Sequence, residues 1–73
     1  MKIKVKDDEE KIVTVINQYI HHERNRAILK RRLCDGILYQ PLAEEFGLSV
    51  RQVKNIVYKC QDIVFQHLDL EQN

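Results

Sequence analysis

Residues 47–56 read GLSVRQVKNI and interleave apolar side chains with cations and amides. Arginine can donate a pair of hydrogen bonds to the major-groove edge of guanine, and asparagine or glutamine can form a similar pair with adenine. In an α-helix of about 3.6 residues per turn, Val53 and Ile56 fall on one side, and the other side is polar. The polar side carries Arg51, Gln52, Lys54, Asn55 and Tyr58. This side has the chemistry to read base edges in DNA, and the alternative is a face that only meets water.

The residues of this polar side have different expected contacts. Arg51 is placed for guanine, and Asn55 or Gln52 for adenine. Ser49 and Gln52 also match an S-x-x-Q capping box at the start of the helix, and if the Gln52 amide serves that box, Arg51 and Asn55 are the better base readers. We expect Ser49 at the interface as well. Phosphates position a protein on DNA without carrying sequence information, and the side chains expected to contact them lie farther along the helix: Lys54, Tyr58 and Lys59.

A block of basic residues lies upstream, within residues 23–34. Only the carboxylate of Glu23 opposes its five cations, which are Arg24, Arg26, Lys30, Arg31 and Arg32. The 73-residue chain carries a formal net charge of only +1 at pH 7, which argues against a general polyanion binder and makes any nucleic-acid footprint local. Because the cations are gathered rather than spread, we expect this block to contact DNA phosphates or an acidic partner. A solvated helix face is the alternative.

The spacing of apolar residues in the first half of the chain predicts two helices. The acids at 7–10 suit the positive end of a helix dipole, and the apolar residues that follow recur at helical spacing, which predicts a first helix over 8–21. A second helix is predicted over 23–34. It should stop at Asp35-Gly36, because glycine accepts the left-handed conformation that closes helices.

The second half of the chain predicts two further helices. Pro41 fits the first turn of a third helix, since its missing N–H is not needed there, and Gly47 ends that helix. The capping box starts a fourth helix, which an uninterrupted apolar stripe extends over 50–68. Without a repeat or linker, the sequence predicts one all-α domain over 1–73, a small bundle of about four helices with a long last helix. For residues 1–7 we expect a mobile basic tail, because a lone edge strand there would lack a partner.

Two short helices joined by a tight turn containing glycine form a helix-turn-helix, whose second helix enters the DNA major groove. Ala43 is small where the third and fourth helices would cross, Gly47 supplies the turn and Leu48 plugs the core beneath it. Apolar residues occupy the inner faces of both helices: Leu42, Phe46, Val53 and Ile56. The pattern predicts this motif, and a plain helical hairpin is the alternative.

The run from Arg24 to Cys60 resembles the promoter-binding region four of bacterial sigma factors, especially the small extracytoplasmic-function type. It has an Asp-Gly turn followed by LAEEFGLSVRQVKNIVYKC. Its most characteristic residues are Ser49, Val50, Val53, Lys54 and Lys59. In that family the last helix reads the upstream promoter element in the major groove, and the domain contacts the flap of RNA polymerase. The resemblance therefore implies double-stranded DNA and RNA polymerase as partners.

The chain departs from the family at two positions, since Arg31 stands where an apolar residue is usual and Pro41 where a glutamate is usual. The 73 residues also hold no region-two core, the part that binds polymerase and melts promoters. We therefore expect a free-standing region-four-like module of the kind found in phage or mobile-element regulators. We expect it in the cytoplasm and not in a membrane, because the longest uncharged apolar stretch, IVTVINQYI, is too short and too polar to span a bilayer.

The chain offers little for metal binding or catalysis. Cys34 and Cys60 lie far apart without CxxC spacing, so we expect small buried thiols, with a disulfide or a metal site as alternatives. His21, His22 and His67 lack the short, paired spacings of a structural zinc site. No phosphate-cradling glycine loop or Ser-His-Asp set is recognisable. We therefore expect no metal, no cofactor and no enzymatic activity.

Apolar residues continue beyond the part of the fourth helix that would read DNA: Ile63, Val64, Phe65, Leu68 and Leu70. Within a monomer they would pack against Ile12, Ile16 and Tyr19. The alternative is contact with a second copy of the chain or with polymerase, which a half-exposed apolar patch favours. Both arrangements stay open at the level of the sequence.

Together these patterns predict sequence-specific binding of double-stranded DNA in transcriptional regulation, with Arg51, Lys54 and Asn55 as the central contacts. The alternative is a protein-interaction module that uses the same fold to bind RNA polymerase or a sigma factor without reading DNA. Salt separates the two, because binding that neutralises phosphates weakens steeply with salt and apolar docking does not.

Overall fold

The computed structural model describes the backbone of residues 6–72 and the side chains of residues 9–68. It contains the helices α1 (Lys6–Tyr19), α2 (Glu23–Leu33), α3 (Tyr39–Phe46) and α4 (Val50–Gln72), and no strand lies within this described part. The predicted all-α bundle with a long last helix is confirmed. The tail expected at the N-terminus lies outside the described residues up to position 5, and positions 6 and 7 belong to α1.

Helix boundaries differ from the sequence prediction mainly at the outer ends. α1 begins at Lys6 and ends at Tyr19, two residues earlier at each end than expected. α4 continues through polar residues to Gln72, because no glycine or proline interrupts it after the apolar stripe. Its 23 residues make a rod of about 35 Å at about 1.5 Å per residue, close to the longest extent of the molecule, 37 Å.

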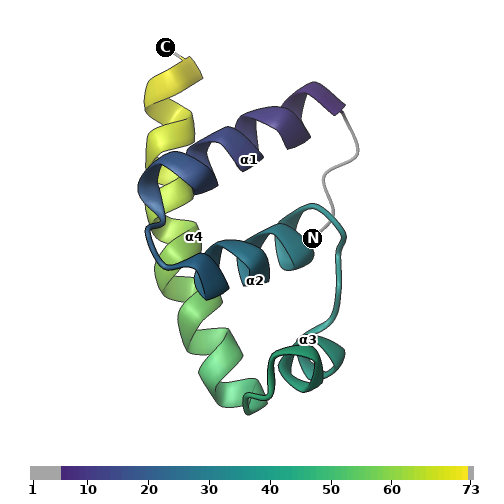
Figure 1. The fold of residues 1–73 in the computed structure, drawn as a ribbon. Helices are drawn as coiled ribbons and strands as arrows, with labels where there is room; N and C mark the ends of the chain where they lie inside the picture. The colour runs from purple at the N-terminus through teal and green to yellow at the C-terminus, as the bar shows by residue number, and fades with distance from the viewer. Residues whose placement is uncertain (1–5, 73) are drawn as a thin grey trace.

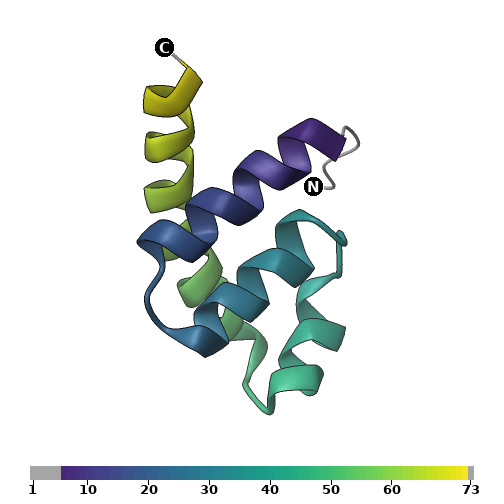
Figure 2. The same cartoon turned by 45° about the horizontal axis from the view of Figure 1, so that its top comes forward.

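α4 is the element against which the other three helices pack (Figure 1). α1 crosses its C-terminal half, α3 lies at its N-terminal end, and α2 lies between them and contacts both. The turned view shows α1 and α2 leaving the same side of α4 one above the other (Figure 2). The two ends of α4 therefore have different neighbours.

The core is built from aliphatic side chains of all four helices. The largest side chains with essentially no exposed surface are Ile16, Ile28, Leu29, Leu42, Val53, Val57 and Val64. Ala43 is buried, as expected at a close crossing of α3 and α4, and Leu48 packs against the core beneath the turn. Burying aliphatic groups of this size is worth about 1.5–3 kcal/mol each before the entropy of ordering them is subtracted. This burial is the main favourable term in so small a chain.

The apolar end of α4 packs within the monomer. Val64 is fully buried, and Ile63, Phe65 and Leu68 are half-buried against the core. The ring of His67 stacks on that of Tyr19 with centroids 3.5 Å apart and planes 2° apart, which joins the end of α1 to α4. The side chain of Leu70, expected in the same stripe, lies outside the described side chains.

The connection between α3 and α4 is closed by hydrogen bonds on both sides. Gly47 has φ 67° and ψ 33°, a left-handed conformation, and its N–H donates to the carbonyls of Ala43 and Glu44. The N–H of Leu48 donates to the Ala43 carbonyl at 2.9 Å. Together these bonds form a Schellman motif, which satisfies carbonyls that the end of the helix would leave without partners.

The predicted capping box starts α4 and is confirmed. The Ser49 N–H donates to Oε1 of Gln52 at 2.9 Å, and the Gln52 N–H donates to Oγ of Ser49 at 3.1 Å. This reciprocal pair satisfies donors at both positions. Three residues, 47–49, therefore join α3 to α4 with little freedom left in the backbone.

An arginine of α2 closes the end of α1. Nη1 of Arg26 donates to the carbonyl oxygens of Ile20 at 3.0 Å and His21 at 3.1 Å. A cation at this end also suits the negative end of the α1 dipole. This contact ties the turn that follows α1 to α2, which begins at Glu23.

Both cysteines are free and buried, which confirms the expectation of small core thiols. Burial desolvates the thiolate and is the main reason that the pKa of each thiol is raised above its ordinary value. For Cys34 the nearby carboxylates of Glu9 and Asp35 add to the increase.

Among the described residues, no helix is long and apolar enough to cross a membrane.

We predict that Gly47→Ala lowers the free energy of unfolding by about 1–2 kcal/mol, because alanine disfavours the left-handed conformation. No atom lies within 4 Å of the position that its Cβ would take, so the loss is conformational and not steric. Urea denaturation measures it. Gly47→Asn is the matched control and should lose less, since asparagine tolerates this conformation better. Equal stability of Gly47→Ala and wild type would contradict the assignment.

The raised thiol pKa values predict how stability changes at high pH. Below the ordinary thiol pKa of about 8.5 the thiols contribute their full stability, and it is lost as pH rises, because the unfolded chain ionises its thiols first. The free energy of unfolding, measured by denaturation between pH 7 and about 10, should therefore fall less steeply with pH for the double variant Cys34→Ala/Cys60→Ala than for wild type. Parallel pH profiles of the two proteins would refute the prediction.

Candidate nucleic-acid interface

The exposed side of α4 carries a row of residues that could enter a DNA groove. Arg51, Asn55 and Tyr58 are all exposed and recur at helical spacing, so they lie one above another along the helix. Tyr58 keeps 50% of its surface exposed despite its size. Asp62 is the next exposed residue at this spacing, and because it is acidic we end the row at Tyr58. The row therefore covers about the first two and a half turns of α4.

The opposite side of α4 determines how this row faces outward. Val53, Val57 and Val64 have no exposed surface and lie roughly half a turn of the helix away from the row. Rotating α4 far enough to bury Arg51 would expose these valines. The core thus holds the row in solvent.

The capping box changes the expected role of Gln52. Its Oε1 accepts the bond from the Ser49 N–H, whereas reading adenine takes both the oxygen and the nitrogen of an amide. Ser49 likewise has its Oγ occupied by the Gln52 N–H. Gln52 could serve the capping box or read adenine, and in the structure it serves the capping box. Arg51 and Asn55 are left as the side chains of the row with base-edge chemistry.

Lys54 and Lys59 lie on opposite flanks of the row, because they are about 60° and 80° away from Arg51 at about 100° per residue. Both side chains are exposed. Lys59 makes no ion pair with a carboxylate among the described side chains. When a helix sits in a DNA groove, phosphates lie on both sides of it, so lysines on the two flanks of the row are placed to contact them.

The five cations of α2 are not equally free. Arg26 caps α1, and Arg31 and Arg32 contact other parts of the chain. Arg24 is exposed, and among the described side chains its only hydrogen bonds are long ones, 3.4 Å to Oδ1 of Asn25. Lys30 is half-buried. The block is therefore partly a structural device that ties α2 to its neighbours.

Arg31 is neutralised by two carboxylates. Its Nη2 lies 2.8 Å from Oε1 of Glu45 in α3, its Nε donates to the same carboxylate, and its Nη1 lies 3.0 Å from Oδ2 of Asp35. The hydrogen bond to Glu45, followed by that to Asp35, raises the pKa of the guanidinium. The arginine that departs from the sigma pattern thus joins α2 to α3 through a bidentate ion pair.

Tyr39, at the start of α3, was not among the residues expected at the interface, yet it connects three of them. Cζ of Arg32 lies 4.5 Å from its ring centroid and Nζ of Lys54 lies 5.6 Å from it. The ring of Tyr58 meets it edge-on, with centroids 6.2 Å apart and planes at 79°. The sequence shows only an aromatic residue two positions before Pro41, a weak signal because its partners come from α2 and α4.

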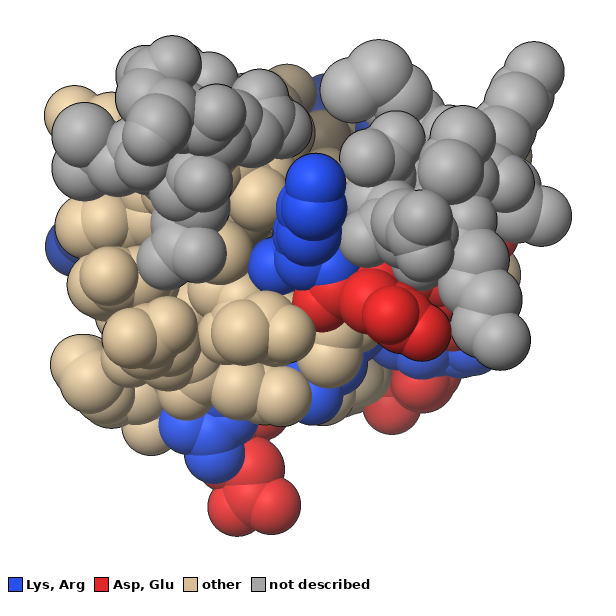
Figure 3. Space-filling view, turned by 90° about the horizontal axis from the view of Figure 1, so that it is seen from above, with Lys and Arg blue, Asp and Glu red and all other residues tan. Residues whose placement is uncertain are grey.

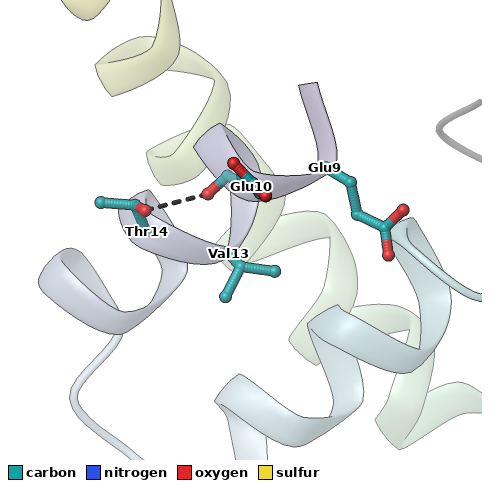
Figure 4. Close-up of a pocket in the computed structure, with 4 residues that line it drawn as sticks. All are labelled: Glu9, Glu10, Val13 and Thr14. Carbon is teal, nitrogen blue, oxygen red and sulfur yellow. Dashed lines mark hydrogen bonds between the residues drawn. The ribbon is translucent and has the colours of Figure 1, made fainter. Parts of the chain in front are cut away.

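Other parts of the described surface fit a phosphate backbone less well. Glu9, Glu10, Val13 and Thr14 line an open depression on α1 (Figure 4), and its two carboxylates would repel phosphates. Oγ1 of Thr14 donates to the Glu10 carbonyl at 2.9 Å and is already satisfied. Seen from above, where α1 and the end of α4 lie, uncharged side chains cover much of the described surface, and most basic ones in view border acidic ones (Figure 3).

No group of histidine, cysteine and carboxylate side chains that could hold a metal ion occurs among the described residues. Comparisons with known proteins add no assignment, since no family model, curated protein or solved structure matches the chain. The candidate site therefore rests on its own geometry: the row on α4, its flanking lysines and the cluster around Tyr39.

Proposed function

We propose that this protein is a sequence-specific, double-stranded DNA-binding transcriptional regulator, in which α3 and α4 form a helix-turn-helix of the sigma-region-four-like class. One observation carries the proposal. Arg51 and Asn55, the two side chains of the row with base-edge chemistry, are exposed side by side at the start of a helix whose other face is fully buried. In helix-turn-helix proteins the first turns of the second helix contact base edges.

The joint between α3 and α4 supports this use. Base reading needs side chains held in a fixed register, and flexible joints lose affinity to the entropy of ordering. The Schellman motif at Gly47 and the capping box of Ser49 and Gln52 fix the backbone on either side of the turn. The start of α4 would therefore already have its binding conformation before it meets DNA.

Each residue of the interface has a role in the proposal. Arg51 donates to O6 and N7 of a guanine, and Asn55 pairs with N6 and N7 of an adenine. Phosphates are held by Lys54 and Lys59 on the flanks of the row, and by Tyr58 in the row itself. Gln52 and Ser49 hold the start of the helix rather than read bases, in line with their mutual hydrogen bonds.

We also propose where the protein acts and which partners it has. The resemblance to sigma region four favours action on transcription in the cytoplasm, with RNA polymerase as a second partner and a phage or mobile element as the source. A homodimer through the C-terminal helix would bring two reading helices to half-sites about one helical turn apart. Because Val64 is already buried in the monomer, such a dimer would use the half-buried residues around it.

A second candidate is a protein-interaction module that binds polymerase or a sigma factor without reading DNA. Leu38 favours it, because this side chain is 69% exposed just before α3, the most exposed large apolar residue among the described side chains. Burying an exposed apolar side chain against a protein partner removes its surface from water and favours binding. The two functions differ in how binding responds to salt.

The deciding experiment is a selection of bound sequences from a random duplex library, followed by fluorescence anisotropy with a selected duplex and a scrambled duplex of equal length. Near physiological salt, the selected duplex should bind more tightly, and log K should fall linearly as log salt rises. Equal affinity for both duplexes would remove base reading. Absence of binding to any duplex would remove the DNA function and favour the interaction module.

Substitutions on α4 should separate base reading from phosphate contact. Arg51→Ala should cost about 1–3 kcal/mol of binding free energy on the selected duplex and relax its sequence preference. Lys54→Ala should weaken binding to all duplexes alike and lower the salt slope by about one. Gln52→Ala is the control for the start of the helix and should lower stability while keeping the sequence preference. If Arg51→Ala loses equal affinity on both duplexes, its contact is with a phosphate.

A further inference from the structure

We infer that Tyr39 is the positioning residue of a phosphate clamp, whose aromatic ring holds Arg32 and Lys54 beside the reading row of α4 to grip the DNA backbone. The inference rests on the proposed function and names residues that the sequence pattern did not assign to a common site. Its parts come from three elements: Arg32 from α2, Tyr39 from α3, and Lys54 from α4.

Both cations lie within the range of attraction to the ring. Cζ of Arg32 is 4.5 Å and Nζ of Lys54 is 5.6 Å from the centroid of Tyr39, and cations within about 6 Å of an aromatic ring are attracted to it. Neither makes an ion pair with a carboxylate among the described side chains. The ring therefore contacts two cations that are free of carboxylates, and a DNA backbone that passes Tyr39 could bind both of them.

Arg32 is oriented by a second contact. Its Nη1 donates to the carbonyl oxygen of Ile37 at 3.1 Å, which together with the ring holds the guanidinium in place. This bond uses one of the five N–H donors of the group. The planar fork of a guanidinium matches the oxygens of a phosphate. A guanidinium held in this way loses less entropy on binding than a free side chain.

Tyr58 links this cluster to the reading row. Its ring meets Tyr39 edge-on at 6.2 Å, and it stands in the same row as Arg51 and Asn55. A phosphate held at Tyr39 would thus lie at the edge of the groove that the row enters. Phosphate contacts of this kind fix the register in which base readers meet their bases.

Arg31 provides the matched control, because it is the neighbour of Arg32 in sequence but has different partners. Glu45 and Asp35 both bind its guanidinium. Removing Arg31 takes away the same formal charge from the same helix. Its guanidinium is already bound to two carboxylates, so it is less available to a phosphate than that of Arg32.

The test measures anisotropy of a selected and a scrambled duplex over a range of salt concentrations. The proteins are wild type, Arg31→Ala, Arg32→Ala, Lys54→Ala, Tyr39→Leu, Tyr39→Phe and the triple variant Arg32→Ala/Tyr39→Leu/Lys54→Ala, which is compared with Arg32→Ala/Lys54→Ala. Circular dichroism confirms that each variant is folded at the assay temperature. Tyr39→Phe retains the ring and tests whether the hydroxyl matters. If Tyr39→Leu fails to fold, the salt slopes of Arg32→Ala and Arg31→Ala still test the clamp.

We expect Arg32→Ala and Lys54→Ala each to lower the salt slope by about one, and Arg31→Ala to lower it by less. Tyr39→Leu should weaken both duplexes about threefold to tenfold, without changing the preference between them. Tyr39→Phe should bind like wild type. In the background without both cations, Tyr39→Leu should cause little further loss, which a purely structural role of Tyr39 would not predict.

Three outcomes would overturn the clamp while leaving DNA binding intact. The first is a folded Tyr39→Leu with wild-type affinity and salt slope. The second is the same loss from Tyr39→Leu with and without the two cations. The third is an equal fall in slope for Arg31→Ala and Arg32→Ala. If wild type binds no duplex, the proposed function fails first and the clamp fails with it.

Discussion

Burial of one face of α4 is the constraint on which the rest of this fold depends. Val53, Val57 and Val64 are fully buried in contact with a core to which all four helices contribute. Because α1, α2 and α3 each pack on this helix, its rotation fixes both what the core contains and what the surface presents. Arg51 and Asn55 face solvent as a consequence of where the valines stand. In so short a chain, structure and candidate site share one set of contacts.

Around that core, polar side chains determine how the helices begin, end and join. Arg26 closes α1, the Arg31–Glu45 pair joins α2 to α3, and the Ser49–Gln52 box starts α4. These contacts are exposed or half-exposed, so each contributes modestly to stability. Their value lies in defining helix ends and angles. They also consume cations and an amide that would otherwise be free to contact a ligand, which leaves a smaller and better defined set for DNA.

The fold was predictable from the sequence where the signals are local. The apolar periodicity, Gly36, Gly47 and the capping box each act over a few residues, and the structure follows them. The candidate site was predictable only in part. The row on α4 follows from helical spacing, but the ring of Tyr39 meets Arg32 and Lys54 only after α2, α3 and α4 have packed together.

The same limit explains the differences at Arg31 and at the end of α1. Glu45 is 14 residues from Arg31, and nothing local marks the two as partners. Arg26 binds a carbonyl six residues back, just past the end of α1, across a turn whose geometry the sequence pattern does not give. Tertiary contacts, not propensity, decide such positions.

The length of α4 has a consequence for how this sequence can vary. The reading row lies near one end of an unbroken helix and Val64 lies toward the other, so both are fixed by one count of residues along the helix. A single insertion or deletion between them would rotate the row by about 100° relative to Val64. Either the row would no longer face the same side of the molecule, or Val64 would leave the core. Substitutions on the outer face of α4 leave this phase unchanged. Substitutions of Arg51 or Asn55 can therefore change what the row recognises while the core stays in place, but the number of residues from Arg51 to Val64 is fixed.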